Sequence, residues 1–328
     1  MEEKDYSGPY QQLQEWVLDR VDQWEEHRNS NYREKWDEYY RIWRGIGTND
    51  DKTRQSEKSR IVSPATQQAI EATVAELEEA TFGGHRWFDV ADDLLDRNPQ
   101  DIEHVRNLLH EDLTKDGVKD AVAECLLNGA IYGTGIGKVL VQDKIEIVAS
   151  EQPVPGTMTT MTETEEVPYV CVKVESVSPK EFVIDPTATT INEALGVAQI
   201  VVKPRYIITK GMKDGIYNDM PLGNFDKADF GFDDEFSNVN NEDDKVKIVE
   251  YWGLVPKRFL KKNASSIDNF NYEDDELVEA VVTIANDSCV LRASENPYMM
   301  HDRPFIAYQH DRVPTKFWGR GVTEKGYN

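Results

Sequence analysis

"NGAIYGTGIGKVLV", residues 128–141, decides the fold, because the hydrophobic pattern changes there from a helical period to a strand period. Three glycines stand at alternate positions within it, Gly133, Gly135 and Gly137. They predict either a phosphate-binding loop, which would make the chain a nucleotide binder, or a corner at which a helix stops and a strand begins. The order of the two elements distinguishes these interpretations.

That order disfavours the phosphate loop. A dinucleotide-binding fingerprint needs G-x-G-x-x-G after a strand, so that the following helix directs its first N–H groups at the pyrophosphate. Here an apolar helix enters the glycines and a strand leaves them, which presents the negative end of the helix dipole. The spacing of Gly135 and Gly137 is also too short, and Lys138 is followed by Val139 rather than by the Ser or Thr of a P-loop. We therefore predict a helix stop and a tight turn that need glycine for positive φ or close backbone contact.

The segments before the corner predict helices. Ser63 and Asn98 are expected N-caps, and each precedes a proline, Pro64 or Pro99, at the first helical position. Gly83 is expected to stop the first of these two helices. The expected inward faces are Ile70, Val74 and Leu77 in the first, Ile102, Val105, Leu108, Leu109 and Leu113 in the second, and Val118, Val122, Cys125 and Leu126 in a third that runs into the corner.

An aromatic stripe occupies the first 45 residues. Its members recur at helical spacing on both sides of a polar gap at 25–31, and they predict a long helix or a helix pair that ends at Gly45 and Gly47. The stripe is typical of a packing face, within the chain or against a neighbouring subunit. Its members are Leu13, Trp16, Val17, Val21 and Trp24, followed by Tyr32, Trp36, Tyr39 and Trp43.

The residues after the corner alternate with period two and predict strands. "KVLVQDKIEIVAS" (138–150) and "VPYVCVKVESVSP" (167–179) flank a segment, 151–166, whose Pro, Gly and Thr content predicts a mobile loop. Further strands are expected near 182–187, 197–203, 245–255, 276–287, 288–294 and 303–310. The acidic segment 229–244 is expected to be a solvated loop.

Composition restricts the class of protein. The chain has 328 residues, 39% hydrophobic and 30% charged, which is too aromatic for a disordered chain and too polar for a membrane protein. No secretory signal begins it and no apolar stretch approaches bilayer length, so we expect a cytosolic origin. The formal charge of −24 argues against ordinary nucleic-acid binding, which depends on Lys and Arg. The negative charge is compatible with a protein that surrounds DNA without binding it tightly.

The side chains that carry chemistry form no recognisable constellation. The three cysteines, Cys125, Cys171 and Cys289, are far apart in the sequence and are expected to be buried free thiols rather than a disulfide or zinc site. The six histidines form no H-E-x-x-H, and no G-x-S-x-G elbow is present. Acids at 225–236 lack the EF-hand pattern, so only a weak cation site is conceivable there. We predict no enzyme, no catalytic, cofactor-binding or metal residues, and no cofactor.

Seven stretches taken in order resemble a known family. They are "YYRIWRG" (39–45), "KSRIVSPATQQAIEATVAELEEATFG" (58–83), "DAVAECLLNGAIYGTGIGKVLV" (120–141), "VESVSPKEFVIDPTA" (174–188), "KPRYIITK" (203–210), "VEYWG" (249–253) and "RPFIAYQHDRVPTKFWGRGVTEKG" (303–326). Each is weak alone, but the ordered set is specific. It resembles the portal, or head-to-tail connector, proteins of tailed bacteriophages, of the short-tailed, podovirus-like type.

The resemblance implies a virion protein that assembles in the host cytoplasm. Such subunits form a homo-oligomeric ring, usually a dodecamer, at a unique capsid vertex, and the ring conducts double-stranded DNA during packaging and genome ejection. The implied partners are the major capsid protein, the terminase large subunit, a head-tail adaptor, a scaffolding protein, and passing DNA bound without sequence specificity. No membrane partner is implied. The family has no catalytic residues to transfer, because ATP hydrolysis belongs to the terminase.

The resemblance also implies a fold class and a division of the chain. The expectation is α+β, with N-terminal amphipathic helices followed by a mixed, strand-rich body like the portal wing. Residues 1–60 are the expected aromatic-rich helical segment, 61–135 the helical part of the wing, and 136–328 its strand-rich part. In the family, long stem helices, a clip and a crown follow "FWGRG", and the expectation is that this chain stops where the stem would begin.

Two alternatives stay open at this stage. The chain could be another virion or tail interaction protein without a DNA channel, in which case the ordered motifs are coincidental. It could also be a nucleotide-dependent enzyme built on "GTGIG", which is the weaker alternative for the reasons given above.

Overall fold

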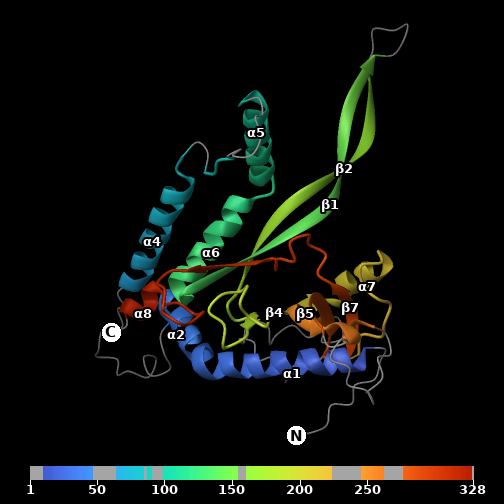
Figure 1. Cartoon of the computed structure of the whole chain (residues 1–328). Helices are drawn as coiled ribbons and strands as arrows, with labels where there is room; N and C mark the ends of the chain where they lie inside the picture. Colours follow the sequence, from blue (N-terminus) through green and yellow to red (C-terminus); the bar gives the residue numbers. More distant parts are fainter. Residues whose placement is uncertain are drawn as a thin grey trace.

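The computed structural model describes residues 10–46, 64–84, 87–90, 99–153, 160–223, 245–261 and 276–326. Helices dominate up to Tyr132, and antiparallel strands dominate from Thr134 onward, which confirms the predicted α+β class (Figure 1). The strands form two sheets within these residues, with orders β2-β1-β8 and β3-β4-β5-β6-β7. The predictions for Ser63, Asn98, Gly47 and the acidic segments at 225–244 lie outside the described residues.

The N-terminal stripe forms one continuous helical run along the edge of the molecule (Figure 1). Helix α1 (Gln11–Arg28) passes through a five-residue π-helical segment, η1 (Asn29–Arg33), into helix α2 (Glu34–Trp43). The π turn overlaps the predicted polar gap at residues 29–31. It changes the helical phase there, so that both halves of the stripe face the body. Gly45 ends the run with a φ of 65°, as predicted.

Three further helices precede the corner. They are α4 (Ala65–Phe82), α5 (Pro99–Lys115) and α6 (Val118–Tyr132). Ile70 and Val74 of α4 are buried as predicted, and so are Cys125 and Leu126 of α6. The prediction for α5 is wrong for three members of its stripe, Val105, Leu108 and Leu109, which are 40–45% exposed.

A long hairpin leaves the corner and projects from the body (Figure 1). Its strands, β1 (Thr134–Pro153) and β2 (Thr160–Val177), pair antiparallel from Ile136 with Val177 to Pro153 with Thr160. The mobile loop predicted at 151–166 is therefore wrong at both ends, where the backbone belongs to the strands. Pairing with β1 satisfies the backbone groups of the Thr- and Glu-rich end of β2 although its composition is a poor strand signal. Strand β8 (Phe305–Gln309) pairs with the base of β1.

The second sheet forms the body beside α1. Its strands are β3 (Phe182–Ile184), β4 (Gly196–Pro204), β5 (Lys245–Pro256), β6 (Leu277–Ala285) and β7 (Cys289–Glu295), all antiparallel to their neighbours. All five overlap segments predicted as strands, and β4, β5 and β7 extend beyond the predicted bounds by one residue at one or both ends. The nine-residue helix α7 (Arg205–Lys213) follows β4 and was not predicted. Two short elements, the 3-10 turn η5 (Lys257–Leu260) and helix α8 (Val322–Gly326), complete the described fold.

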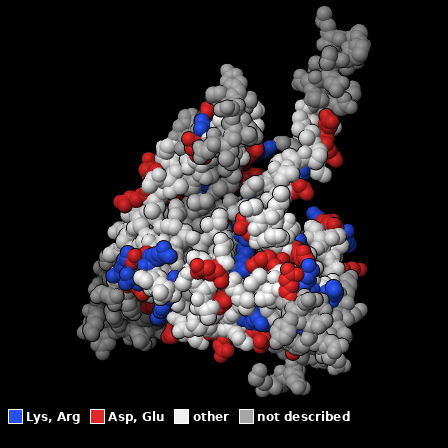
Figure 2. Space-filling model, viewed as in Figure 1, with Lys and Arg blue, Asp and Glu red and all other residues white. Residues whose placement is uncertain are grey.

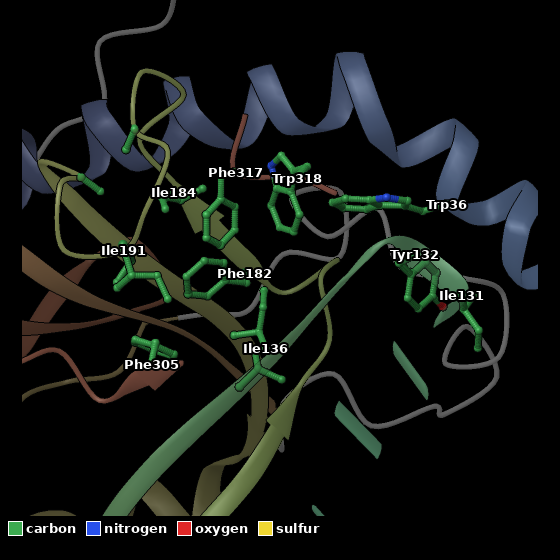
Figure 3. Packing of buried hydrophobic residues seen from close by; sticks show 14 of the residues in the cluster. Trp36, Ile131, Tyr132, Ile136, Phe182, Ile184, Ile191, Phe305, Phe317 and Trp318 are labelled. Carbon is green, nitrogen blue, oxygen red and sulfur yellow. The ribbon is translucent and has the colours of Figure 1, made fainter. Parts of the chain in front are cut away.

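Aromatic side chains pack the N-terminal run against the second sheet and against the segment around Trp318. Trp24 of α1 stacks on Tyr251 of β5 at 6.2 Å between ring centroids, and Trp16 meets the same ring edge-on at 6.1 Å. Farther along, Trp36 of α2 packs edge-on against Trp318 at 4.8 Å, next to Phe182 (Figure 3). Each such pair adds about 0.5–1.5 kcal/mol beyond the area it buries. The stripe is thus a packing face within the chain.

Candidate functional site

The corner at Gly133 is where three distant segments meet. Gly133 follows α6 with a φ of 98°, and a Cβ there would lie 2.2 Å from the carbonyl oxygen of Gly319. The Gly319 N–H donates to Thr134 Oγ1 at 2.9 Å, and the His310 N–H donates to the Gly133 carbonyl at 3.0 Å. The predicted helix stop with positive φ is confirmed. The backbone itself fills this corner.

The two other glycines of the triplet differ in their surroundings. A Cβ on Gly135 would lie 1.9 Å from the Cys125 carbonyl oxygen, so close backbone contact requires glycine there. A Cβ on Gly137 would lie 3.5 Å from Cys125 Sγ, an ordinary contact. The space that a phosphate would need beside Gly133 and Gly135 is thus occupied by the chain's own carbonyl groups, which repel anions. The arrangement favours a packed corner over a nucleotide loop.

A buried ion pair joins the two sheets above this corner. Lys138 of β1 is only 6% exposed, and its Nζ lies 2.8 Å from Glu250 Oε1 of β5 and donates to Gln199 Oε1 of β4 at 3.0 Å. Burial, the largest single influence, would raise the pKa of the Glu250 carboxyl, but Lys138, the Trp252 indole N–H and Lys203 together hold this pKa below its usual value. The pair fixes β1, the root of the hairpin, to the second sheet.

This ion pair predicts an acid sensitivity. A carboxyl whose pKa is lower in the folded state contributes stability that is complete above its unfolded pKa, about 4.3, and is lost as the pH falls through the folded value. Replacing Glu250 by Gln should lower the free energy of unfolding at pH 7 by about 1.5–3 kcal/mol, the size of a hydrogen bond to a charged group. Urea titrations from pH 7 to pH 3 should show this difference shrinking as the pH falls. A difference that stays constant over that range would contradict the role of the Glu250 charge.

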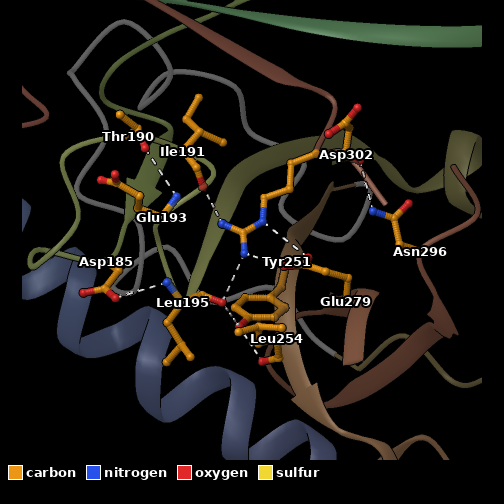
Figure 4. A network of polar contacts seen from close by, with 11 residues as sticks. Asp185, Thr190, Ile191, Glu193, Leu195, Tyr251, Leu254, Glu279, Asn296 and Asp302 are labelled. Carbon is orange, nitrogen blue, oxygen red and sulfur yellow. Dashed lines mark hydrogen bonds and ion pairs between the residues drawn. The ribbon is translucent and has the colours of Figure 1, made fainter. Parts of the chain in front are cut away.

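A second buried cation organises the loop between β3 and β4. Arg303 donates to the carbonyls of Ile191 and Leu195 and forms an ion pair with Glu279 of β6, at 2.7 Å (Figure 4). The Arg303 side chain is only 3% exposed. Asp185 accepts from the Leu195 N–H at 3.2 Å, so both ends of the Leu195 peptide are held. This network is structural, and its Asp185 also lines a cavity of about 210 Å³ between α1 and residues 315–318.

The other side chains considered for chemistry are placed as follows. All three cysteines are buried free thiols, as predicted, and burial raises the pKa of Cys125 and Cys289, which keeps them as weakly nucleophilic thiols. Among the described residues, no group of three His, Cys, Asp or Glu side chains is close enough to hold a metal ion. No helix of the described residues is both long and apolar enough to cross a bilayer.

The surface carries the features that an interaction site requires. One side of the hairpin exposes mostly apolar residues, interrupted by Asp143 and Glu166. Its apolar members, here called the outer hairpin face, are Val141, Ile145, Ile147, Pro168, Val170 and Val172. Four of them are 54–68% exposed, namely Val141, Ile145, Ile147 and Val170. An exposed apolar patch of this kind marks a protein contact. Sequence patterning indicated the alternation but not which side of the hairpin the body would cover.

Two helices add opposite charges to this surface. Helix α4 contains Glu71, Glu76, Glu78 and Glu79 and no Lys or Arg. Helix α7 contains Arg205, Lys210 and Lys213 and no acid, although Asp214 follows it directly. Figure 2 shows acidic side chains along the α4 flank and basic side chains, with acidic ones beside them, on the flank that carries α7. The chain's net acidity is therefore unevenly distributed.

Comparison with known proteins identifies the class. A family model described as phage SU10 portal protein matches residues 109–327, a range that begins in the second half of α5 and includes the corner, both sheets and α8. The match places the chain among phage portal proteins. Because it covers about two thirds of the sequence, the chain belongs to the phage SU10 portal protein family, and the predicted resemblance is confirmed. No curated protein matches the chain.

Proposed function

We propose that this chain is the structural subunit of a portal ring at one capsid vertex, through which double-stranded DNA is packaged and later ejected and to which the tail attaches. Family membership over residues 109–327 is the observation that carries the proposal. In this family the ring usually has twelve copies. The proposed contacts are the major capsid protein, the terminase large subunit, a head-tail adaptor, a scaffolding protein and the passing duplex.

The electrostatics support a conduit that does not grip DNA. Protein that neutralises phosphates with Lys and Arg holds DNA through counterion release, whereas this chain has a formal charge of −24. We infer a channel wall that binds DNA weakly and without sequence specificity, so that the duplex can slide through. ATP hydrolysis is assigned to the terminase. The proposed location is the virion, after assembly in the host cytoplasm.

The order of helices and strands supports a division of the chain into two structural parts of a wing-like domain. We propose that 1–60 and 61–135 form the helical part of the wing and that 136–328 forms its strand-rich part. The corner at Gly133 joins the helical part to the strand-rich part, and the bridge from Lys138 to Glu250 joins the two sheets of the strand-rich part, so all of them would move as one body in the ring.

The test is the assembly state of the purified chain. Native mass spectrometry should detect closed oligomers, and electron microscopy should show rings with a central hole wide enough for a duplex. Monomers or dimers over a broad concentration range would contradict the proposal. Closed assemblies without a hole would favour the second candidate, a virion or tail component without a DNA channel, which the same exposed apolar surface supports.

A further inference from the structure

The outer hairpin face has the wrong polarity for a solvated surface. A hairpin with one side against the body and one side in water should be polar on the water side. Here the side toward α6 holds Cys171, which is buried, and Lys144, whose Nζ lies 3.5 Å from Asp116 Oδ1. Farther along the hairpin the same side also exposes Val148 and Val167. The other side holds the six apolar residues, with Asp143 and Glu166 among them. The described residues of the chain leave this largely apolar side exposed.

The same chain exposes a second apolar surface of matching kind. Val105, Leu108 and Leu109 of α5, here called the α5 stripe, are 42%, 45% and 40% exposed at i, i+3 and i+4 spacing. Both α5 and the hairpin project from the body at the same end, the top of Figure 1. Helices α4 and α7 lie below them, on opposite flanks (Figure 1).

The opposite charges of α4 and α7 favour a head-to-tail contact between two copies over a two-fold contact. In a two-fold contact each surface meets itself, so α7 would face α7 or α4 would face α4, with like charges opposed. In a head-to-tail contact α7 of one copy faces α4 of the next, and three basic residues oppose four acidic ones. That arrangement also brings the outer hairpin face to the level of the next copy's α5. A head-to-tail contact that closes on itself makes a ring.

We propose that the outer hairpin face of one copy packs on the α5 stripe of the next copy, with α7 of the first facing α4 of the second. This contact rests on the proposed ring and specifies which surfaces join in it. The occupant is a second copy of this chain, because each copy carries both halves of the contact at the same height. In a closed ring the hairpin of every copy packs on one neighbour, and its α5 stripe is contacted by the hairpin of the other neighbour. The outer hairpin face and the α5 stripe are then covered in all copies.

Cross-linking tests the pairing directly. A chain with Val170→Cys and Leu108→Cys, treated with a short bis-maleimide at assembly concentration, should give a ladder of covalent oligomers on denaturing gels. Each single substitution should give none, because the two positions meet only across the contact. The native cysteines are all buried, which limits background reaction.

A disruption experiment measures the energy of the contact. Ile145→Asp places a charge on the outer hairpin face at a position that is 66% exposed, so the fold should be retained. It should raise the concentration for half-assembly at least tenfold, as loss of one apolar anchor at an interface does. Leu277→Asp, at a residue 48% exposed on β6, is the matched control and should assemble normally.

The outcomes separate this inference from the proposed function. Rings that form without the ladder would overturn the contact and leave the portal ring intact. Dimers from the single Val170→Cys chain would show a like-on-like contact and also overturn it. Only monomers, in the wild-type chain and in all variants, would contradict the ring and the contact together. The cross-linking result decides the matter even if Ile145→Asp fails to fold.

Discussion

Gly135→Ala is expected to lower the free energy of unfolding by about 3 kcal/mol, the upper end of the cost of over-packing. Its new methyl group would lie 1.9 Å from the Cys125 carbonyl oxygen. The methyl group is fixed directly to the β1 backbone and the carbonyl belongs to the α6 backbone, so relief requires these two elements to separate. Urea unfolding followed by tryptophan fluorescence measures the loss, since Trp36 and Trp318 are both buried in the adjoining core.

Gly137→Ala provides the matched control within the same triplet. Its methyl group would be 3.5 Å from Cys125 Sγ, and the position is a strand interior without positive φ. Glycine in a strand costs about 0.5–1 kcal/mol relative to alanine, so this substitution should be neutral or slightly stabilising. Equal losses for the two substitutions would contradict the role of close backbone contact at Gly135.

Arg303→Met is expected to cost about 3 kcal/mol or more, because it removes one partner of a buried ion pair. Glu279 would lose its counter-charge, and the Ile191 carbonyl would lose the donor that the guanidinium supplies. The loop between β3 and β4 should loosen as a result. Urea unfolding gives the free energy, and hydrogen exchange at 186–195 should show faster exchange in the variant.

Arg320→Met tests the same chemistry at the surface. Arg320 pairs with Asp311 at 2.9 Å, but the two side chains are 52% and 30% exposed. Exposed pairs contribute about 0–1 kcal/mol, so this change should be small. A loss at Arg320 as large as that at Arg303 would mean that burial does not set the cost, contrary to the structure.

Local signals in the sequence predicted much of the fold. Pro99 at the start of α5 and Gly45 after α2 act through backbone geometry alone, so their effect is independent of distant contacts. The period change at the corner was equally reliable, because α6 is apolar at helical spacing and β1 alternates. The order of the weak motifs then indicated the family that the comparison confirms.

Features that depend on distant partners were not predictable in the same way. The end of β2 at 160–166 is a strand only because β1 lies opposite, and no residue in that segment signals the partner. Periodicity located the apolar side of α5 correctly but could not tell whether the body or another molecule covers it. Lys138 and Arg303 are single cations in apolar strands or loops, and their roles follow from carboxylates 112 and 24 residues away.

The corner has a consequence for how the protein is made. The Gly319 amide that donates to Thr134 lies 185 residues farther along the chain. At about 5–20 residues per second, a ribosome needs about 10–40 s to deliver it after the first half of the corner emerges. During that interval the end of α6 lacks its backbone neighbour, and the nascent polypeptide displays apolar surface that chaperones recognise. The yield of folded protein should therefore depend on the chaperone supply of the cell that translates it.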